Sequence, residues 1–388
     1  MQILPKSLYA AFDTYPAPKG AAVHIREFAQ TLFTHTGSGL LLVLGDENLP
    51  SWQIEGGMQI RRLASDEPNY LKRAMQFGEF VYAHAEMLRS DLQIAHFRDP
   101  WSGIPLLDVQ DRRYKTVYEV NALPSIELPA RYGAISSTTC NKIRLFEKRC
   151  WEEADWIVCP SQVIKNCLTE LGANASKITV IPNGAKLIDP TQISLPADSP
   201  EQYLIYFGAV QSWQGVEVLF KAMTFLRDMP ELKLVLCASG SKPRLKYLQK
   251  LAVRMGLEQQ LIWHFKVSQT VVTEWLAGAA ISIAPLVECS RNLIQGCCPI
   301  KIVESMAMGK PVIASDLPVV RELLEHNQTG WLIRPDRPAE LARAIRILLA
   351  HPQERDRIGE NARRKASTDL TWEASANTLK AIYSQLLA

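Results

Sequence analysis

Residues 281–316 read ISIAPLVECSRNLIQGCCPIKIVESMAMGKPVIASD, and this stretch predicts a strand, a loop, a helix and a second strand. The opening run ISIAP has the length and apolar composition of a buried parallel strand. From Ile300 to Met308 the apolar side chains recur at helical spacing, and Gly309 and Pro311 are typical of a helix end followed by a new strand. The loop before the helix therefore lies at the carboxyl edge of a parallel sheet, where open α/β sheets bind ligands.

The start of this helix has the chemistry of an anion site. First-turn N–H groups lack intrahelical partners, so we expect the peptide groups of Cys298, Ile300 and Lys301 to face a ligand. Lys301 opposes the helix dipole, and a bound phosphate would explain its position. Glu304, three residues on, lies on the same face, and its carboxylate can accept two hydrogen bonds from a ribose diol. Taken alone, the two residues are better explained as an exposed ion pair.

The motif does not stand alone. From Pro299 to Asp316 the chain reads P-x-K-x-x-E-x-M-A-x-G-x-P-V-I-A-S-D, closely similar to the donor-site segment of the retaining GT-B glycosyltransferases of family 4. The resemblance implies an α/β fold of two Rossmann-like, doubly wound parallel-sheet domains that face each other across a cleft. It also implies that Glu304 holds the ribose of a nucleotide sugar, and that the loop at Val267 helps to cradle the base.

Length and composition agree with a globular protein of two domains. The chain has 388 residues, 47% of them hydrophobic and 21% charged, and a formal net charge of +3, which does not suggest a nucleic-acid partner. No apolar run approaches a membrane span and no signal peptide is predicted, so we expect a cytoplasmic protein. The eight cysteines contain no C-x-x-C pair, and we interpret them as reduced thiols without a metal site.

The first half of the chain alternates strands with helices, which indicates a parallel, doubly wound sheet. An apolar run at 8–12 leads to Gly20 and Ala21 and then to an amphipathic helix. Gly20 lets a ligand approach the backbone closely, although one glycine at such a turn is common. This loop resembles the first loop of family 4, which faces the donor phosphates and the acceptor.

Polar residues follow two later strands of this half: His96, Arg98, Glu119 and Asn121. We expect them in the cleft, on its acceptor side. Members of the family often carry a histidine where Asn121 stands; asparagine can bind a sugar hydroxyl but cannot act as a general base. For each residue taken singly, tethering a loop is an equal alternative.

The resemblance also implies domain boundaries. We expect an acceptor-side domain over 1–184, a linker over 185–202, a donor-side domain over 203–370 and a final helix over 371–388 that packs back on the first domain. The basic residues Lys142, Arg144, Lys148 and Arg149 are interpreted as a solvated helix face, with contact to an anionic membrane surface as the alternative.

Three further positions depart from the family pattern. Many members carry an arginine after the first glycine of the loop at Gly208 and a lysine before its second glycine, and this chain has Ala209 and Gln214 there. Arg291 and Lys301 are the candidates to replace these cations. Gly296 stands where the family has the first glutamate of an E-x7-E pair, which usually holds sugar hydroxyls, so the donor sugar is left undetermined.

We therefore predict a retaining, metal-independent hexosyltransferase without a cofactor, with Lys301, Arg291 and Asn121 as catalytic candidates. Charge that develops on the leaving nucleoside diphosphate would be stabilised by a helix N-terminus and cations. The acceptor would be a glycan, a lipid-linked or a small-molecule hydroxyl, in polysaccharide or glycolipid biosynthesis, and contact with the inner face of a membrane stays open. The alternatives are a catalytically silent nucleotide-sugar-binding subunit and, less well matched, a GT-B epimerase.

Overall fold

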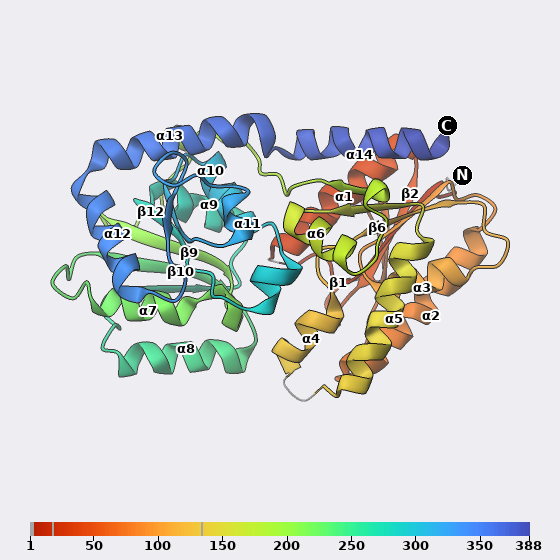
Figure 1. The fold of residues 1–388 in the computed structure, drawn as a ribbon, viewed down its shortest axis with the longest axis horizontal. Helices are drawn as coiled ribbons and strands as arrows, with labels where there is room; N and C mark the ends of the chain where they lie inside the picture. Colours follow the sequence, from red (N-terminus) through yellow and green to blue (C-terminus); the bar gives the residue numbers. More distant parts are fainter. Residues whose placement is uncertain (1–3, 18, 133–134) are drawn as a thin grey trace.

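The computed structural model describes residues 4–17, 19–132 and 135–388, which form two α/β domains side by side (Figure 1). The first domain is built on an eight-stranded sheet of order β3-β4-β2-β1-β5-β6-β7-β8, parallel except for the β3–β4 pair. Its strands are β1 Ser7–Thr14, β2 Gly39–Leu44, β3 Trp52–Glu55, β4 Met58–Leu63, β5 Ile94–Phe97, β6 Lys115–Glu119, β7 Trp156–Cys159 and β8 Ile178–Val180. Its helices are α1 Gly20–Thr36, α2 Tyr70–Leu88, α3 Pro100–Asp108, α4 Pro124–Tyr132, α5 Ser137–Glu153 and α6 Gln162–Glu170.

Alternation along the central strand β1 explains how both faces of this sheet are covered. Leu8 and Ala10 belong to a core shared with α2, α3, α5 and α6, whereas Tyr9 and Ala11 belong to a core on the opposite face shared with α1. Successive side chains of a strand point to opposite faces, so a strand buried on both sides is apolar throughout. The sequence GLLLVL of β2 is accordingly buried at every position.

The second domain has a six-stranded, fully parallel sheet of order β11-β10-β9-β12-β13-β14. Its strands are β9 Tyr203–Ala209, β10 Lys233–Ser239, β11 Leu261–Phe265, β12 Ile281–Ala284, β13 Val312–Ser315 and β14 Trp331–Ile333. Its helices are α7 Val216–Thr224, α8 Lys242–Arg254, α9 Gln269–Gly278, α10 Ile300–Ala307, α11 Pro318–Arg321, α12 Pro338–Ala350 and α13 Pro352–Asp369. The fold class predicted from the sequence is confirmed, and β12, α10 and β13 are the strand, helix and strand expected between 281 and 316.

The last helix, α14 Trp372–Leu387, leaves the second domain and lies along the first (Figure 1). Its side chains Leu379, Ile382 and Tyr383 join the core formed by α1 and the sheet. Between β8 and β9 the chain passes the start of α14 at Gly184, where a Cβ would lie 2.3 Å from the backbone nitrogen of Trp372. Burial of an apolar helix face therefore ties the end of the chain to its first domain.

Within the part of the chain that the structure describes, no helix has both the length and the apolar character needed to cross a bilayer.

Candidate active site

A cleft of about 530 Å³ lies between the two domains, at the carboxyl ends of their central strands. Most of the residues singled out in the sequence line it: Gly20, Ala21, Arg98, Asn121, Gly208, Val267, Arg291, Cys298, Ile300, Lys301 and Glu304. The two domains meet closely there, because a Cβ on Gly20 of the first domain would lie 3.1 Å from Cγ2 of Ile300 of the second. Glycine at position 20 thus lets the two walls approach each other.

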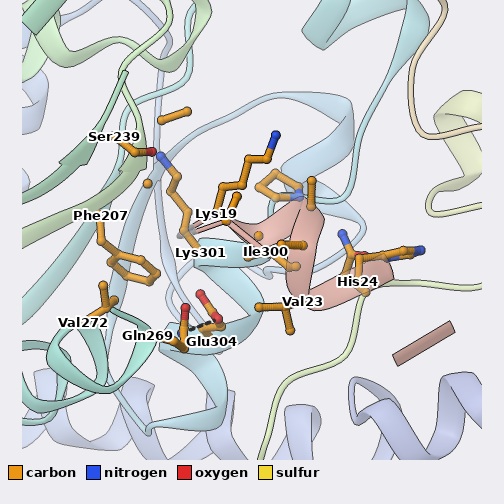
Figure 2. A pocket seen from close by; sticks show the side chains of 18 of the residues that line it. Lys19, Val23, His24, Phe207, Ser239, Gln269, Val272, Ile300, Lys301 and Glu304 are labelled. Carbon is orange, nitrogen blue, oxygen red and sulfur yellow. Dashed lines mark hydrogen bonds between the residues drawn. The ribbon is translucent and has the colours of Figure 1, made fainter. Parts of the chain in front are cut away.

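Lys301 enters the cleft from the first turn of α10, and its side chain is almost fully buried (Figure 2). Its Nζ donates a hydrogen bond to Oε1 of Gln214 at 2.7 Å and lies 4.0 Å from the ring centroid of Tyr206. Burial, with a smaller contribution from the charge of the nearby Arg291, lowers the pKa of Lys301 to about 7. Among the described residues, no carboxylate forms an ion pair with this ammonium group.

The glycine loop, which runs from Gly208 near the end of β9 to Gly215, makes room for this lysine. Gly208 has a φ of +108°, which glycine adopts without strain, and a Cβ at this position would lie 3.6 Å from Cε of Lys301. The side chain of Lys301 therefore crosses from α10 to the loop that connects β9 with α7. One ammonium group, a glycine loop and the start of a helix converge on the same part of the cleft.

Glu304 lies one turn further along α10. Its Oε1 accepts a hydrogen bond of 2.8 Å from Nε2 of Gln269, as Figure 2 shows. Burial raises the pKa of Glu304 to about 7, and the bond from Gln269 opposes this increase. Phe207 and Val272 lie beside the pair and give this end of the cleft an apolar wall.

Arg291 also lines the cleft, but it has a carboxylate partner. Its Nε donates to Oε1 of Glu127 on α4 at 2.7 Å, so the guanidinium joins the second domain to the first. It also lies 5.2 Å from the ring centroid of Trp213. The charge of Arg291 is therefore partly neutralised in this structure, in contrast to that of Lys301.

His96 and Glu119 are not where the sequence analysis expected them. Both are buried and neither lines the cleft; they lie beneath its floor. Oε2 of Glu119 accepts a 2.6 Å hydrogen bond from the hydroxyl of Tyr9 and lies 3.1 Å from Nε2 of His96, whose Nδ1 lies 2.8 Å from the hydroxyl of Tyr383 on α14. The expectation failed because α14, distant in sequence, covers His96, and because the side chains around Glu119, among them Tyr9, enclose its carboxylate.

Glu119 instead positions residues that do reach the cleft. Its Oε1 accepts from Nε of Arg98 at 2.8 Å and from the amide nitrogen of Asn121. Burial alone would raise the pKa of Glu119, but the charges of His24 and Arg98 and the hydrogen bonds it receives hold that pKa well below its usual value. A fixed carboxylate thus orients Arg98 and Asn121 on the acceptor side of the cleft.

Two further cleft residues, His24 and Asn183, were not predicted as site residues. His24 lies one turn after Gly20 on α1; its Nε2 is 2.8 Å from Oε1 of Glu119 and its Nδ1 is 2.7 Å from Oδ1 of Asn183. Asn183 donates to the carbonyl oxygen of Cys298 at 2.8 Å, across the domain boundary. The spacing from Gly20 was a signal for His24, whereas Asn183 stands in a Pro-Asn-Gly sequence, which is typical of a turn and gives no signal of a cleft residue.

Gly296 faces the other domain and does not line the cleft. A Cβ at this position would lie 2.9 Å from Cγ1 of Val163 and 3.0 Å from the backbone nitrogen of Ile164, both at the start of α6. The preceding residue, Gln295, is fully buried and accepts a 3.0 Å hydrogen bond from the backbone nitrogen of Leu123. The loop between β12 and α10 is therefore a second contact between the domains, and it contains a π-helical turn over Arg291–Gln295.

The same contact continues at Glu322, directly after α11. Its two carboxylate oxygens accept hydrogen bonds from the backbone nitrogens of Gln162 and Val163, at 2.8 and 2.9 Å. These N–H groups belong to the first turn of α6 and have no intrahelical acceptor, and the helix dipole favours a carboxylate there. A side chain of the second domain thus completes a helix of the first.

As for metal ligands, the described residues contain no group of three or more His, Cys, Asp or Glu side chains placed to hold an ion.

The chain matches two protein families that together span most of its length. Residues 18–187 match Glycosyltransferase Family 4, and residues 189–365 match Glycosyl transferases group 1. A D-inositol 3-phosphate glycosyltransferase of Thermomonospora curvata is 28% identical over 371 residues, covering 86% of this chain and 83% of the relative.

Two solved structures with the same fold show the similarity, one a named enzyme and the other a protein solved with a nucleotide sugar. Sucrose-phosphate synthase from Thermosynechococcus elongatus superposes with a TM-score of 0.78 at 20% identity, and HepE from Anabaena in complex with UDP-glucose with a TM-score of 0.74 at 17% identity. Each comparison covers 98% of this chain and 99% of the other. With both domains matched in sequence and in architecture, the chain belongs to the GT-B glycosyltransferases of family 4.

Proposed function

We propose that this glycosyltransferase moves a sugar from a nucleoside diphosphate sugar to a hydroxyl acceptor, with retention of anomeric configuration and without a divalent metal. One observation carries the proposal: Lys301 is a buried ammonium group without a carboxylate partner among the described residues. A buried charge is costly unless an opposite charge neutralises it. A diphosphate in the cleft would supply that charge.

The residues around Lys301 suit the departure of a diphosphate. The N–H groups of Ile300 and Lys301 lie in the first turn of α10, where no intrahelical acceptor exists, and the dipole of the helix favours an anion. Together with the ammonium group they would stabilise the negative charge that grows on the leaving phosphate, the step at which fixed charges lower the barrier most. Protein groups would thereby take the part that a divalent cation plays elsewhere.

Retention would follow from attack on the face that the diphosphate leaves. The acceptor hydroxyl would approach from the wall of the first domain, and a phosphate oxygen would take its proton. Asn121, held by Glu119, would bind a sugar hydroxyl there without acting as a base. Arg98, held by the same carboxylate, would bind the acceptor.

The named relatives guide the choice of substrates. HepE was solved with UDP and with UDP-glucose, so UDP-glucose is the first donor to test. The names of the T. curvata relative and of sucrose-phosphate synthase contain a phosphorylated polyol and a phosphorylated sugar. We propose an acceptor screen of inositol phosphates and sugar phosphates beside lipid-linked and polymeric glycans.

The testing experiment measures slow donor hydrolysis without acceptor, across UDP-, GDP-, ADP- and dTDP-sugars, together with thermal stabilisation by each nucleotide. Lys301→Met removes the cation, and Lys310→Met, just beyond the other end of α10 and outside the cleft lining, is the matched control. We expect one diphosphate to be released, and both release and stabilisation to be lost only in Lys301→Met. Stabilisation without release, and without transfer to any acceptor in the screen, would favour a silent binding subunit. If no donor is hydrolysed and no nucleotide stabilises the protein, the proposal is overturned.

A further inference from the structure

Gln269 is fixed at the edge of the cleft by the start of α9. Ser268 caps this helix, with its side chain accepting a hydrogen bond from the backbone nitrogen of Val271. Gln269 is therefore the first residue of the helix, and its side chain extends towards Glu304, as Figure 2 shows. The two residues come from different elements, α9 and α10, and meet on the wall where Phe207 and Val272 also lie.

The hydrogen bond between them fixes which atoms remain free. Ionised Glu304 has no proton to donate, so the amide nitrogen of Gln269 faces its Oε1, at 2.8 Å. Oε1 of Gln269 then points away from that bond, and Oε2 of Glu304 is the second oxygen of the carboxylate. In the described part of the chain neither of these two oxygens has a hydrogen-bond partner. Two acceptor oxygens, held relative to each other by the bond between their own side chains, thus line the cleft.

We propose that Gln269 is a second ribose-binding residue, and that Gln269 and Glu304 each accept a hydrogen bond from one hydroxyl of the vicinal diol of the donor. The proposal rests on the function proposed above and adds a requirement to it: the donor carries an intact ribose. A 2′-deoxynucleotide donor lacks one of the two hydroxyls, so it forms one hydrogen bond fewer with the site and binds less tightly. The site would therefore select ribonucleoside diphosphate sugars over dTDP-sugars.

The same hydrogen bond also keeps Glu304 competent as an acceptor. Burial raises the pKa of Glu304, and the amide of Gln269 opposes that increase by donating to the charged form. Without Gln269 the carboxyl group would take up a proton at higher pH and become a donor on one oxygen. Gln269 thus contributes an acceptor of its own and positions that of Glu304.

The first test compares equilibrium binding of UDP, GDP and ADP with binding of their 2′-deoxy and 3′-deoxy counterparts to the full-length protein. For the diphosphate that binds best, we expect each missing hydroxyl to weaken binding on the order of 10- to 100-fold. Equal binding of the ribo and deoxy forms would overturn this inference and leave the proposed function standing. No binding by any diphosphate would overturn both.

Variants of Gln269 separate recognition from a purely structural role. Gln269→Ala is expected to weaken binding of the ribo form about tenfold and that of the 2′- or 3′-deoxy form much less, so that the preference shrinks. Gln269→Glu places two carboxyl groups together, and binding should recover only at low pH, where the pair shares a proton. Thr270→Ala, exposed on the same turn and outside the cleft lining, should change neither. An unchanged ribose preference in Gln269→Ala, or a pH-independent Gln269→Glu, would contradict the proposal.

Discussion

The ammonium nitrogen of Lys301 lies 2.7 Å from Oε1 of Gln214, the residue that precedes the second glycine of the loop after β9. A lysine at 214 would extend its own ammonium group into this region, and here the loop carries a neutral amide while the cation arrives from α10. The charge at the glycine loop is thus present, although the residue that supplies it belongs to another element. The arrangement makes the two positions separable by mutation.

A first prediction tests whether a lysine at 214 can supply the positive charge in place of Lys301. Lys301→Met should lower donor kcat/KM by 100-fold or more, because loss of a cation at a developing charge costs about 3 kcal/mol or more. The double variant Lys301→Met/Gln214→Lys returns an ammonium group from the other side of the contact and should recover at least tenfold of that loss. Steady-state kinetics with the best donor measures both. A double variant no better than Lys301→Met would show that the cation acts only from α10.

A second prediction concerns stability without substrate. Lys301 is buried with a pKa lowered to about 7, so the folded protein binds this proton less tightly than the unfolded chain, and its stability rises with pH from about 7 towards the pKa of an ordinary lysine. Lys301→Met removes the buried charge with little change of volume and should raise the free energy of unfolding at pH 6 by on the order of 1 kcal/mol. Denaturant unfolding at pH 6 and pH 9 measures this; an equal change at both pH values would contradict the assignment.

A third prediction is the pH dependence of donor capture. Lys301 loses its charge as pH rises above about 7, and Glu304 loses its charge as pH falls below about 7, because burial shifts the two pKa values towards each other. The form with both groups charged is therefore most populated near pH 7, and kcat/KM should fall on either side. Lys301→Arg should extend activity to higher pH, since arginine stays protonated, and Glu304→Gln should flatten the acid limb. If both variants kept both limbs of the pH profile, groups other than Lys301 and Glu304 would cause the loss of activity at high and low pH.

The contact between Glu322 and α6 gives a fourth prediction. Its carboxylate accepts two backbone hydrogen bonds across the domain boundary, so Glu322→Ala leaves two N–H groups of α6 without a protein partner. We expect the domains to separate more readily, seen as a larger radius of gyration in solution scattering and a weaker donor affinity. Glu325→Ala, exposed nearby and without a side-chain bond in the described structure, is the control. An unchanged radius of gyration and donor affinity would show that the other contacts alone keep the cleft closed.

The sequence predicted the parts of the site that are formed by consecutive strands, loops and helices. The strand, loop and helix around Lys301 and Glu304 are contiguous, so helical spacing and edge position were enough to bring both residues to the cleft. His96 and Glu119 lie near the carboxyl ends of β5 and β6, yet α14 covers His96 and a ring of donors encloses Glu119. Local pattern cannot distinguish a strand end that opens to a cleft from one that a distant helix closes.

The neighbouring sequence likewise did not predict which residues pair with the charged groups. Gln214 and Gln269 are neutral residues in loops or at a helix start, and nothing in their neighbourhood along the chain marks them as contacts of Lys301 and Glu304. Arg291 was a candidate to replace the missing cations, but it pairs with Glu127 of the first domain. That contact depends on how the two domains dock. Such contacts follow from the arrangement of domains, which no single segment encodes.

A last prediction concerns Gly296, which combines a φ of +88° with a tight contact to α6. Gly296→Ala adds a Cβ at 2.9 Å from Val163 to a residue with φ +88° and ψ 173°, a region that essentially only glycine occupies, so it should both destabilise the fold and push the domains apart. Gly172→Ala is the matched control, because Gly172 has a similar φ of +99° and nothing within 4 Å of an added Cβ. Backbone strain should cost each variant on the order of 1 to 3 kcal/mol of unfolding free energy. Only Gly296→Ala should also lose donor affinity and gain radius of gyration; equal behaviour of the two would mean that the close packing against α6 is not needed to form the cleft.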